Sequence, residues 1–542
     1  MNSFRSKLSA TAVLGVFLFA TLISSVFGAS SGVFAANAPD TSAKVSFTFD
    51  DGLSSALLAA QTLQTYGFTG TDYIITHCIG LQAGAANNDC GSDVNAGDSL
   101  AVMESETKNH MSWSDIATLH NTYGWEIGSH TVTHPLTAAV DNPSLTDAQL
   151  DTEMSGSQLA LAQMGYPATD FASPYGDYDN RSLAVIAKYY ASHRTFQDLT
   201  YTSTATTCTP ASTTNVFPYY APGSTYPYNN YLLTVMEVQG GTTPAQVEKC
   251  VAQAKANNQW LILVFHEIKA TGDPTYDASP AAYEYTTGDL ATIAAYVKSV
   301  SLPVVNVTNA LASGTNLMPN STFNDGIVDG WTTDSPTTIT ADKQTTSLAG
   351  HGSFDGSTTG ALNSILLKGS ASDSHLFSPR VTVVPGITYT LTNFVNVTST
   401  SGEVDFYIDE YDAAGNDLKT GHLVAGITGS AKANNVQVGD VNFLYTPSST
   451  NVASARLQVI AHGAKVAAYV DNLQWLSPNG ATAPPTTKSG DVNKDGTIDA
   501  LDLSTVLTNW NKTGQTAAQG DLNGDGTIDA LDLSIILSNW SK

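Results

Sequence analysis

Two adjacent carboxylates and a pair of spaced histidines are the residues of this chain best suited to metal-assisted hydrolysis. Asp50 and Asp51 follow an alternating run at residues 45–49 that is typical of a strand, and a glycine comes next. His130 and His134 are four residues apart, so both rings can face one metal if the segment makes a single turn. Two histidines with one carboxylate leave coordination positions open for water and substrate. Taken alone, the two aspartates could equally form a solvated turn, because Asp and Gly are common turn residues.

Four short motifs follow one another along the first half of the chain. They are TFDDG at 48–52, GWEIGSHTVTHP at 124–135, FASPYGDY at 171–178 and LILVFHEI at 261–268. Each is weak alone, but their order and distances resemble those of the polysaccharide deacetylases, carbohydrate esterase family 4. The resemblance covers residues 41–310, and it implies a distorted, incomplete (β/α) barrel that removes acetyl groups from a polysaccharide.

The resemblance also implies a role for each candidate residue. It places a divalent metal, zinc or another transition metal, on Asp51, His130 and His134. It makes Asp50 the general base that takes a proton from the attacking water. The backbone N–H of Tyr175 would stabilise the developing oxyanion, and His266 would protonate the leaving amine or alkoxide. The products would be acetate and a deacetylated sugar.

The chain departs from the family pattern at two places. Many members carry an arginine two residues before the Pro-Tyr-Gly of the third motif, where it orients the base, but here that position is Ala172. The fourth motif, usually an Asp and a Trp, is not recognisable, and its nearest candidates are Arg194 and Asp198. Either another group orients Asp50, or the pKa of this base is less well controlled. The two departures also weaken the assignment of a substrate.

Several of these residues also have a simpler interpretation. His134 precedes a proline and could be an ordinary loop histidine. His266 follows five apolar residues and could be a satisfied core histidine, and Tyr175 could serve only in packing. Glu267 is a tempting second acid, but strand alternation places it on the opposite side from His266.

The chain as a whole carries a strong acidic excess. Its 48 acidic and 22 basic residues give a formal net charge of −26. This charge argues against nucleic acid or an anionic membrane surface as a partner. Part of the excess is local, because eight aspartates lie in two short C-terminal loops, where bound cations would offset them.

Residues 1–38 have the pattern of a secretory signal peptide. Arg5 and Lys7 precede an apolar core at residues 11–23, and small residues follow. The apolar stretch is shorter than the ~20 residues that a membrane-spanning helix needs, which disfavours an uncleaved anchor. We therefore expect a secreted, extracellular protein, held at a cell surface or on a scaffold without a membrane segment of its own.

An oxidising compartment also fits the cysteines, because the chain has four of them, an even number. Three pairings are possible, and we expect Cys78 to pair with Cys90 and Cys208 with Cys250. None of the four has zinc-ligand spacing, and none has a histidine partner that would make it a catalytic thiol.

Residues 41–310 alternate between strand-like and helix-like segments. The expected strands are 45–49, 71–76, 125–127, 169–172, 260–265 and 304–307. The expected helices are 53–66, 112–122, 145–164, 181–190, 246–258 and 289–300. Such alternation predicts a parallel sheet or barrel. Candidates such as Asp50 and His266 follow strands, which is the face where barrel active sites lie.

The sequence changes character after this first domain. Residues 315–478 are rich in Thr, Ser, Val and Gly, with alternating runs such as 388–395 and 404–411 that are typical of an all-β sandwich. The ends, NLMPN at 316–320 and AYVDNL at 468–473, resemble the jelly-roll carbohydrate-binding modules of families 4 and 9. The aromatic candidates for stacking on a sugar are Trp331, Tyr407, Tyr411 and Trp475, most of which we expect in the core. The alternative is a spacer that binds no sugar.

A Pro-containing linker at 479–489 leads to an internal repeat. Residues 490–510 and 520–540 are identical at 16 of 21 positions, and each contains the pattern of an EF-hand-like calcium loop. The expected Ca²⁺ ligands are Asp491, Asn493, Asp495, Thr497, Asp499 and Asp502 in the first copy, and Asp521, Asn523, Asp525, Thr527, Asp529 and Asp532 in the second. The loops depart from an EF-hand in having Asp at the twelfth position and one helix each, expected at 503–510 and 533–540.

This combination at residues 490–542 resembles a dockerin, the module that joins secreted enzymes to cohesin-bearing scaffolds. The near-identity of the two halves would allow two related binding orientations. The alternative is a purely structural calcium module without a cohesin partner.

The sequence therefore predicts a multidomain protein, with an α/β distorted (β/α) barrel, an all-β jelly-roll sandwich and a small α calcium-binding dockerin. We expect a secreted, metal-dependent deacetylase acting on an N-acetylglucosamine polymer such as chitin or peptidoglycan. Ester cleavage on plant-wall xylan is the alternative within the same chemistry. A non-catalytic sugar-binding or scaffold component is the alternative of another class, although base, metal ligands and acid are all present.

Overall fold

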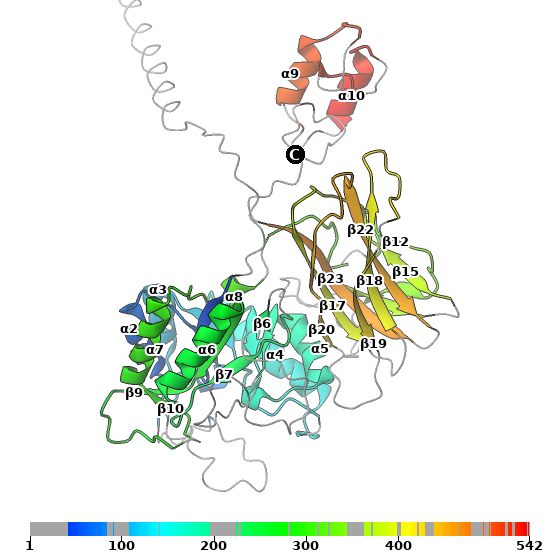
Figure 1. The fold of residues 1–542 in the computed structure, drawn as a ribbon. Helices are drawn as coiled ribbons and strands as arrows, with labels where there is room; N and C mark the ends of the chain where they lie inside the picture. Colours follow the sequence, from blue (N-terminus) through cyan, green and yellow to red (C-terminus); the bar gives the residue numbers. More distant parts are fainter. Residues whose placement is uncertain are drawn as a thin grey trace, which may run out of the picture.

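The fold of the chain is given by a computed structural model, in which three folded parts follow one another (Figure 1). The structure describes residues 42–83, 90, 108–139, 141–195, 224–225, 229–279, 282–311, 314–323, 326–343, 363–369, 372–397, 403–419, 422–428, 438–463, 466–478, 492, 498, 500–514, 519–522, 526–538 and 540. The expected signal peptide and linker lie outside these residues. Within the described ranges, no helix has the length and apolarity that crossing a membrane requires.

Seven parallel strands form the wall of a nearly closed barrel. They are β1 (Lys44–Phe49), β2 (Thr71–Ile74), β3 (Glu126–Ser129), β4 (Asp170–Ala172), β5 (Ser192–Arg194), β7 (Val235–Glu237) and β8 (Gln259–Phe265). The order is β5-β4-β3-β2-β1-β8-β7, and a parallel bridge from Arg194 to Leu233 brings the two ends together. The short β6 (Ser224–Thr225) pairs antiparallel with β8. The predicted distorted (β/α) barrel is thereby confirmed.

Helices lie outside the barrel strands (Figure 1). They are α2 (Ala56–Gln64), α3 (Trp113–Tyr123), α4 (Asp147–Gln163), α5 (Asn180–Tyr189), α6 (Pro244–Ala256) and α7 (Thr287–Ser299), with shorter turns at η1 (Thr76–Cys78), η3 (Pro174–Gly176) and α8 (Val307–Ala310). Side-chain caps begin several of them; the Ser112 hydroxyl, for example, accepts from the Asp115 N–H. Strands β9 (Glu267–Lys269) and β10 (Glu284–Thr286) pair in parallel as a small separate sheet.

Alternation along β1 decides which side chains reach the barrel interior. Val45, Phe47 and Phe49 belong to the hydrophobic core that also contains residues of the outer helices. Successive side chains of a strand point to opposite faces, so Thr48 and then Asp50 face the interior. The Thr48 hydroxyl accordingly donates to the Leu263 carbonyl of β8 at 2.9 Å. The strand thus delivers the first candidate carboxylate to the carboxyl end of the barrel.

One expected strand is wrong. Residues 304–307 make only an isolated parallel bridge, between Val304 and Val45, and Val307 already begins helix α8. The amide of Val305 still donates to the Val45 carbonyl at 3.0 Å, so the segment passes beside β1 before it turns. A short apolar run does not by itself distinguish a strand from the approach to a helix.

The second part is a sandwich of two antiparallel sheets, as the sequence predicts. One sheet contains β11 (Thr315–Asn316), β13 (Ile339–Lys343), β14 (Asn363–Lys368), β17 (Tyr389–Val397), β20 (Val438–Asp440), β21 (Phe443–Tyr445) and β23 (Ala467–Ser477). The other contains β12 (Thr332–Thr333), β15 (Ser374–Phe377), β16 (Val381–Thr382), β18 (Glu403–Tyr411), β19 (His422–Thr428) and β22 (Ser454–His462). Trp331, Tyr411 and Trp475 are buried and Tyr407 is half-buried, so most of the aromatic candidates lie in the core.

The barrel domain and the sandwich share a buried contact. The register of β17 shifts between Thr392 and Phe394, and Phe394 joins a hydrophobic cluster made of barrel residues instead of the sandwich core. Its ring meets the Tyr231 ring edge to face, with 5.4 Å between centroids. Beside it, the carboxylate of Asp440 accepts from the Asn230 N–H at 3.3 Å. Burial raises the pKa of Asp440 to about 7.

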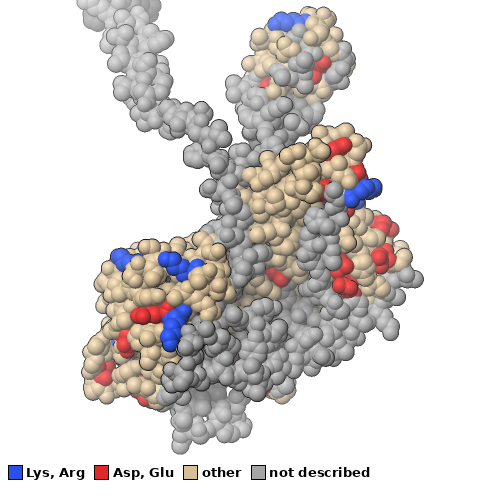
Figure 2. All heavy atoms as spheres, viewed as in Figure 1, with Lys and Arg blue, Asp and Glu red and all other residues tan. Residues whose placement is uncertain are grey.

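The C-terminal part contains helices α9 (Ala500–Thr508) and α10 (Ala530–Ser538), each beginning three residues earlier than expected. They pack on a small core that includes Val506, Ile528 and Ile536. Figure 2 shows charged side chains in small separate groups among the uncharged described residues of this face. Charged residues are only 13% of the sequence, which agrees with this distribution.

Candidate active site

Asp51, His130 and His134 converge at the carboxyl end of the barrel. Asp51 Oδ1 lies 3.6 Å from His130 Nε2 and 3.6 Å from His134 Nε2. The two Nε2 atoms are 3.1 Å apart. These atoms form one of the two groups of possible metal ligands among the described residues. The structure therefore brings together the three residues that the sequence motifs connect.

The chemistry of this donor set fits a divalent transition metal. Ligand atoms about 2.0–2.2 Å from a tetrahedral zinc ion would lie roughly 3.3–3.6 Å from one another, close to the distances observed. His130 Nδ1 is 2.8 Å from the Ala172 carbonyl, which can only accept a hydrogen bond. Its proton is therefore on Nδ1, and the lone pair of Nε2 points at the other two ligands.

The protonation of the other two ligands also suits a metal. Burial, and next the adjacent His130, lower the pKa of His134 to about 3, so its ring is neutral at physiological pH. Burial acts to raise the pKa of Asp51, but the nearby imidazoles of His266, His134 and His130 outweigh it. The net effect lowers the pKa of Asp51 well below its usual value, and the carboxylate is charged.

The segment from His130 to His134 is an irregular turn with side-chain support. The amide of His134 donates to the Thr131 hydroxyl at 2.8 Å. The Glu153 carboxylate of α4 accepts from the amides of Val132 and Thr133, each at 2.9 Å. In an α-helix, side chains at positions i and i+4 lie on one face; here the irregular turn brings the side chains of His130 and His134 together instead. Sequence reasoning missed Glu153, since it lies 20 residues away on a helix.

Four residues of the site and its histidine turn have left-handed backbone conformations. The φ angles are 74° at Asp51, 68° at Thr131, 66° at His134 and 55° at Tyr175. Such conformations are strained for residues other than glycine, and they persist where the surrounding structure holds them. Their concentration around one cluster supports a functional site.

Asp50 lies beneath the cluster and is 1% exposed. Its Oδ1 accepts a hydrogen bond from Nη2 of Arg194, which is equally buried. Its Oδ2 faces His266 Nε2 at 4.0 Å and has no hydrogen-bond partner among the described residues. Burial lowers the pKa of His266, which follows β8 as the sequence predicts. The candidate base and the candidate acid therefore face each other.

Two half-exposed tyrosines flank these groups. The Tyr175 ring is 4.6 Å from the His134 ring, and the Tyr283 ring is 4.8 Å from the His266 ring. Their exposures are 49% and 47%, among the highest for large apolar or aromatic residues of the barrel. The third motif identifies Tyr175, but Tyr283 belongs to no motif. Its only sequence signal is an aromatic residue just before the strand that begins at Glu284.

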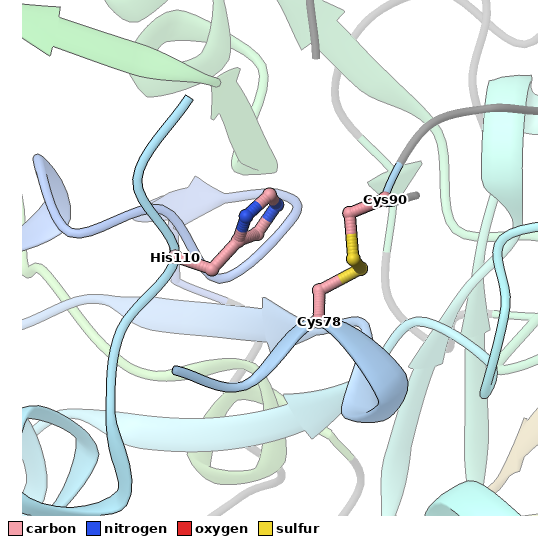
Figure 3. Close-up of side chains that lie close together, drawn as sticks. All are labelled: Cys78, Cys90 and His110. Atoms are coloured by element: carbon pink, nitrogen blue, oxygen red, sulfur yellow. A yellow bond between two sulfur atoms is a disulfide. The ribbon is translucent and has the colours of Figure 1, made fainter. Parts of the chain in front are cut away.

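A disulfide supports the turn that follows Asp51. Cys78 and Cys90 are bonded, as expected, with 5.5 Å between their Cα atoms, and the His110 ring lies beside them (Figure 3). The sulfur atoms are bonded to each other, so this second group is not a metal site. Next to His110, the Met111 amide donates to the Gly52 carbonyl at 2.9 Å. Cys250 is disulfide-bonded too, and Cys208 lies outside the described residues.

The expected calcium ligands are only partly within the described residues. Asp502, Asp521, Thr527, Asp529 and Asp532 are described, whereas Asp491, Asn493, Asp495, Thr497, Asp499, Asn523 and Asp525 are not. The two halves use the same hydrogen bond. Asp502 accepts from the Val492 N–H and Asp532 from the Leu522 N–H, each at 2.7 Å. The repeat in the sequence is therefore a repeat in local structure.

Comparisons with known proteins agree with this organisation. Residues 37–191 match the family model of the polysaccharide deacetylases, and residues 489–539 match that of the dockerin type I domain. No curated protein matches the chain. The first match ends before His266.

Several solved structures are similar to parts of the chain. The peptidoglycan N-acetylglucosamine deacetylase Bc1960 is 12% identical, over 51% of this chain and 90% of that one, with a TM-score of 0.29. A family 4 carbohydrate esterase from Streptomyces lividans is 17% identical, over 48% of this chain and 91% of that one, with a TM-score of 0.26. The CBM22-1 xylan-binding domain of Xyn10C from Paenibacillus barcinonensis is 17% identical, over 31% of this chain and 98% of that one, with a TM-score of 0.22.

Proposed function

The chain contains a polysaccharide deacetylase domain and a type I dockerin domain, and from this premise we propose that it deacetylates an N-acetylglucosamine polymer such as chitin or peptidoglycan. The observation that carries the proposal is the convergence of five side chains. Asp51, His130 and His134 present three metal-ligand atoms, while Asp50 and His266 face each other beside them.

The metal would be zinc or another divalent transition ion held by Asp51, His130 and His134. When bound, it would polarise an acetyl carbonyl and bring the pKa of a water molecule to about 7. The lowered pKa values of Asp51 and His134 favour the charged carboxylate and the neutral ring that such an ion requires, and the Ala172 carbonyl fixes the ring of His130. Removal of the metal should therefore abolish activity without unfolding the barrel.

The residues of the chain would carry the proton transfers. Asp50 would accept the proton of the attacking water on Oδ2, since its Oδ1 is already bound to Arg194. The Tyr175 N–H would donate to the oxyanion formed from the carbonyl. His266 would donate a proton to the leaving nitrogen as the C–N bond breaks. Because its Nε2 is 4.0 Å from Asp50 Oδ2, the two groups can serve the same reacting carbonyl.

The same groups would act on an acetyl ester, with an alkoxide instead of an amine as the leaving group. Ester cleavage on acetylated xylan is therefore the substrate alternative.

The sandwich would bind sugar or act as a spacer. The first 38 residues would direct export, and the dockerin would attach the enzyme to a cohesin-bearing scaffold outside the cell, with Ca²⁺ in both repeats.

Acetate release tests the proposal. The full chain, loaded with zinc, would be offered N-acetylchitooligosaccharides, peptidoglycan and acetylated xylan in parallel. We expect release from an N-acetylated substrate. Release from xylan alone would move the assignment to an esterase, and release from none would favour a non-catalytic sugar-binding component.

A further inference from the structure

Arg194 lies one strand away from a position where the family resemblance leads us to expect an arginine. That position is Ala172, at the end of β4. Strands β4 and β5 pair in parallel, and Ala172 is the register partner of Arg194. Side chains of paired residues in neighbouring strands point to the same face of a sheet. Arg194 therefore enters the barrel interior at the same level as the missing arginine would.

The guanidinium group of Arg194 reaches across the interior to a carboxylate and an aromatic ring. Its Nη2 donates to Asp50 Oδ1, although the two residues are 144 positions apart. Its Cζ lies 4.8 Å from the centre of the Tyr73 ring. Arg194 and Asp50 are each 1% exposed, and Tyr73 is fully buried. A buried planar cation with these partners has a defined orientation.

Ala172 is suited to this arrangement because its side chain is a single methyl group. It is fully buried, and its carbonyl already accepts the hydrogen bond from His130. An arginine at both positions would place two cations on the same face at the same level. They would compete for one carboxylate in a site where unpaired charge is costly.

We propose that Arg194 is the positioning residue for Asp50 and takes the place of the arginine missing at Ala172. This inference rests on the proposed function, in which Asp50 is the base. The ion pair holds Oδ1, compensates the burial of the carboxylate and leaves Oδ2 directed toward His266. A base displaced by about 1 Å can lose roughly 100-fold in rate, so the orientation of this carboxylate controls catalysis.

The test compares Arg194→Met with Arg194→Lys in the full zinc-loaded chain. For Arg194→Met we expect kcat to fall about 100-fold with KM within about 2-fold, because the base is misplaced while substrate contacts remain. Lysine keeps the charge but not the planar group, so we expect an intermediate loss. The matched control is Arg181→Met, which removes another Arg–Asp pair of the same domain, to Asp147, and should leave kcat unchanged.

A transposed variant, Ala172→Arg with Arg194→Ala, tests whether the interior needs one arginine at either of two paired positions. It should recover at least about 10-fold in kcat over Arg194→Ala alone, a gain that a purely structural role of Arg194 would not produce. Zn²⁺ affinity is measured by titration for every variant and should change by less than about 3-fold.

A crystal structure of Arg194→Met supplies a result that does not depend on activity. We expect the Asp50 carboxylate to have rotated away from its present position. If the parent releases no acetate, the proposed function fails while this structure still tests the role of Arg194. The inference is overturned if Asp50 keeps its orientation, if kcat stays within about 3-fold of the parent, or if the loss follows Zn²⁺ affinity.

Discussion

Asp50 and Asp51 are neighbours in the chain, but their carboxylates have different partners. Asp50 is paired with Arg194 inside the barrel, whereas Asp51 lies 3.6 Å from each of two histidine nitrogens at its mouth. The positive φ of 74° at Asp51 produces this separation, because the chain leaves the strand conformation there. One strand end thus presents the proposed base and a proposed metal ligand to different surroundings.

Asp72 should make stability depend on pH. It is fully buried, and neither of its carboxylate oxygens has a hydrogen-bond partner among the described residues. Burial, followed by the nearby charges of Asp50 and Asp51, raises the pKa of Asp72 well above 3.8. In the unfolded chain the group ionises near that ordinary value. Its contribution to folding therefore becomes more unfavourable as the pH rises above about 4.

The variant Asp72→Asn removes this titration. We expect it to be more stable than the parent by about 1–3 kcal/mol at pH 7.5, with a smaller difference at pH 4.5. Thermal unfolding at the two pH values measures the effect. A stability difference that does not depend on pH would contradict the assignment.

Phe394 should couple the unfolding of the barrel to that of the sandwich. Its ring is completely buried in the cluster that contains Tyr231 of the barrel domain. Truncation of a buried phenylalanine typically costs about 3–5 kcal/mol. We expect the parent to unfold the two domains in one calorimetric transition and Phe394→Ala to separate them into two.

The matched control for this prediction is Phe377→Ala. Phe377 is a half-buried residue of the sandwich, whose ring contacts Arg456 and His375 instead of the barrel. This variant should lower the stability of the sandwich without changing the number of transitions. Two transitions in the parent would contradict the coupling.

The disulfide between Cys78 and Cys90 should stabilise the metal site indirectly. The loop that it closes has a sequence separation of 12, and cross-links of this size are worth about 2–4 kcal/mol. The same region hydrogen-bonds to the turn after Asp51, through the Met111 amide and the Gly52 carbonyl. The double variant Cys78→Ser/Cys90→Ser should lose stability by this amount and bind zinc more weakly. Unchanged zinc affinity would show that the loop does not support the site.

Tyr283 should contribute to substrate binding. Its half-exposed ring packs 4.8 Å from the ring of His266, so one side is fixed while part of the ring stays accessible. An aromatic ring in this setting can pack against a sugar. We expect Tyr283→Ala to raise KM about 10-fold and Tyr283→Phe to leave KM unchanged, because the ring and not the hydroxyl makes the contact. Steady-state kinetics on soluble oligosaccharides distinguish this outcome from a loss of kcat alone.

Local sequence patterns identified the parts of the site that lie next to each other in the chain. The predicted strand at 45–49 placed Asp50 at the face where barrel active sites lie, and the spacing of His130 and His134 predicted that both rings could face one metal. The patterns could not identify contacts across the barrel. Arg194 reaches Asp50 from 144 residues away, and Glu153 supports the histidine turn from a helix. The sequence names Arg194 only as a candidate for the unrecognised fourth motif, and nothing local indicates that Arg194 or Glu153 enters the site, because only the folded barrel brings them into contact with it.

The same limitation explains the error at residues 304–307. The segment is partly buried, since Val307 is fully buried. Its residues form the start of helix α8 and a single bridge between Val304 and Val45, and not a strand. In the sandwich, the alternation of apolar and polar residues predicted strands β17 and β18. It did not predict that the Phe394 side chain leaves the sandwich core, because the direction of this side chain depends on the register shift between β17 and β23.

The most direct test of the account measures bound zinc and released acetate in the same three proteins: the parent, Asp50→Asn and Asp51→Asn. We predict that the parent binds one zinc ion at the barrel site and releases acetate from an N-acetylated oligosaccharide, and that chelation followed by Zn²⁺ restores the activity. Asp50→Asn should bind zinc as well as the parent but lose activity by at least about 100-fold. Asp51→Asn should lose both. Full activity in Asp50→Asn, or normal zinc binding in Asp51→Asn, would contradict the division of roles between these two carboxylates.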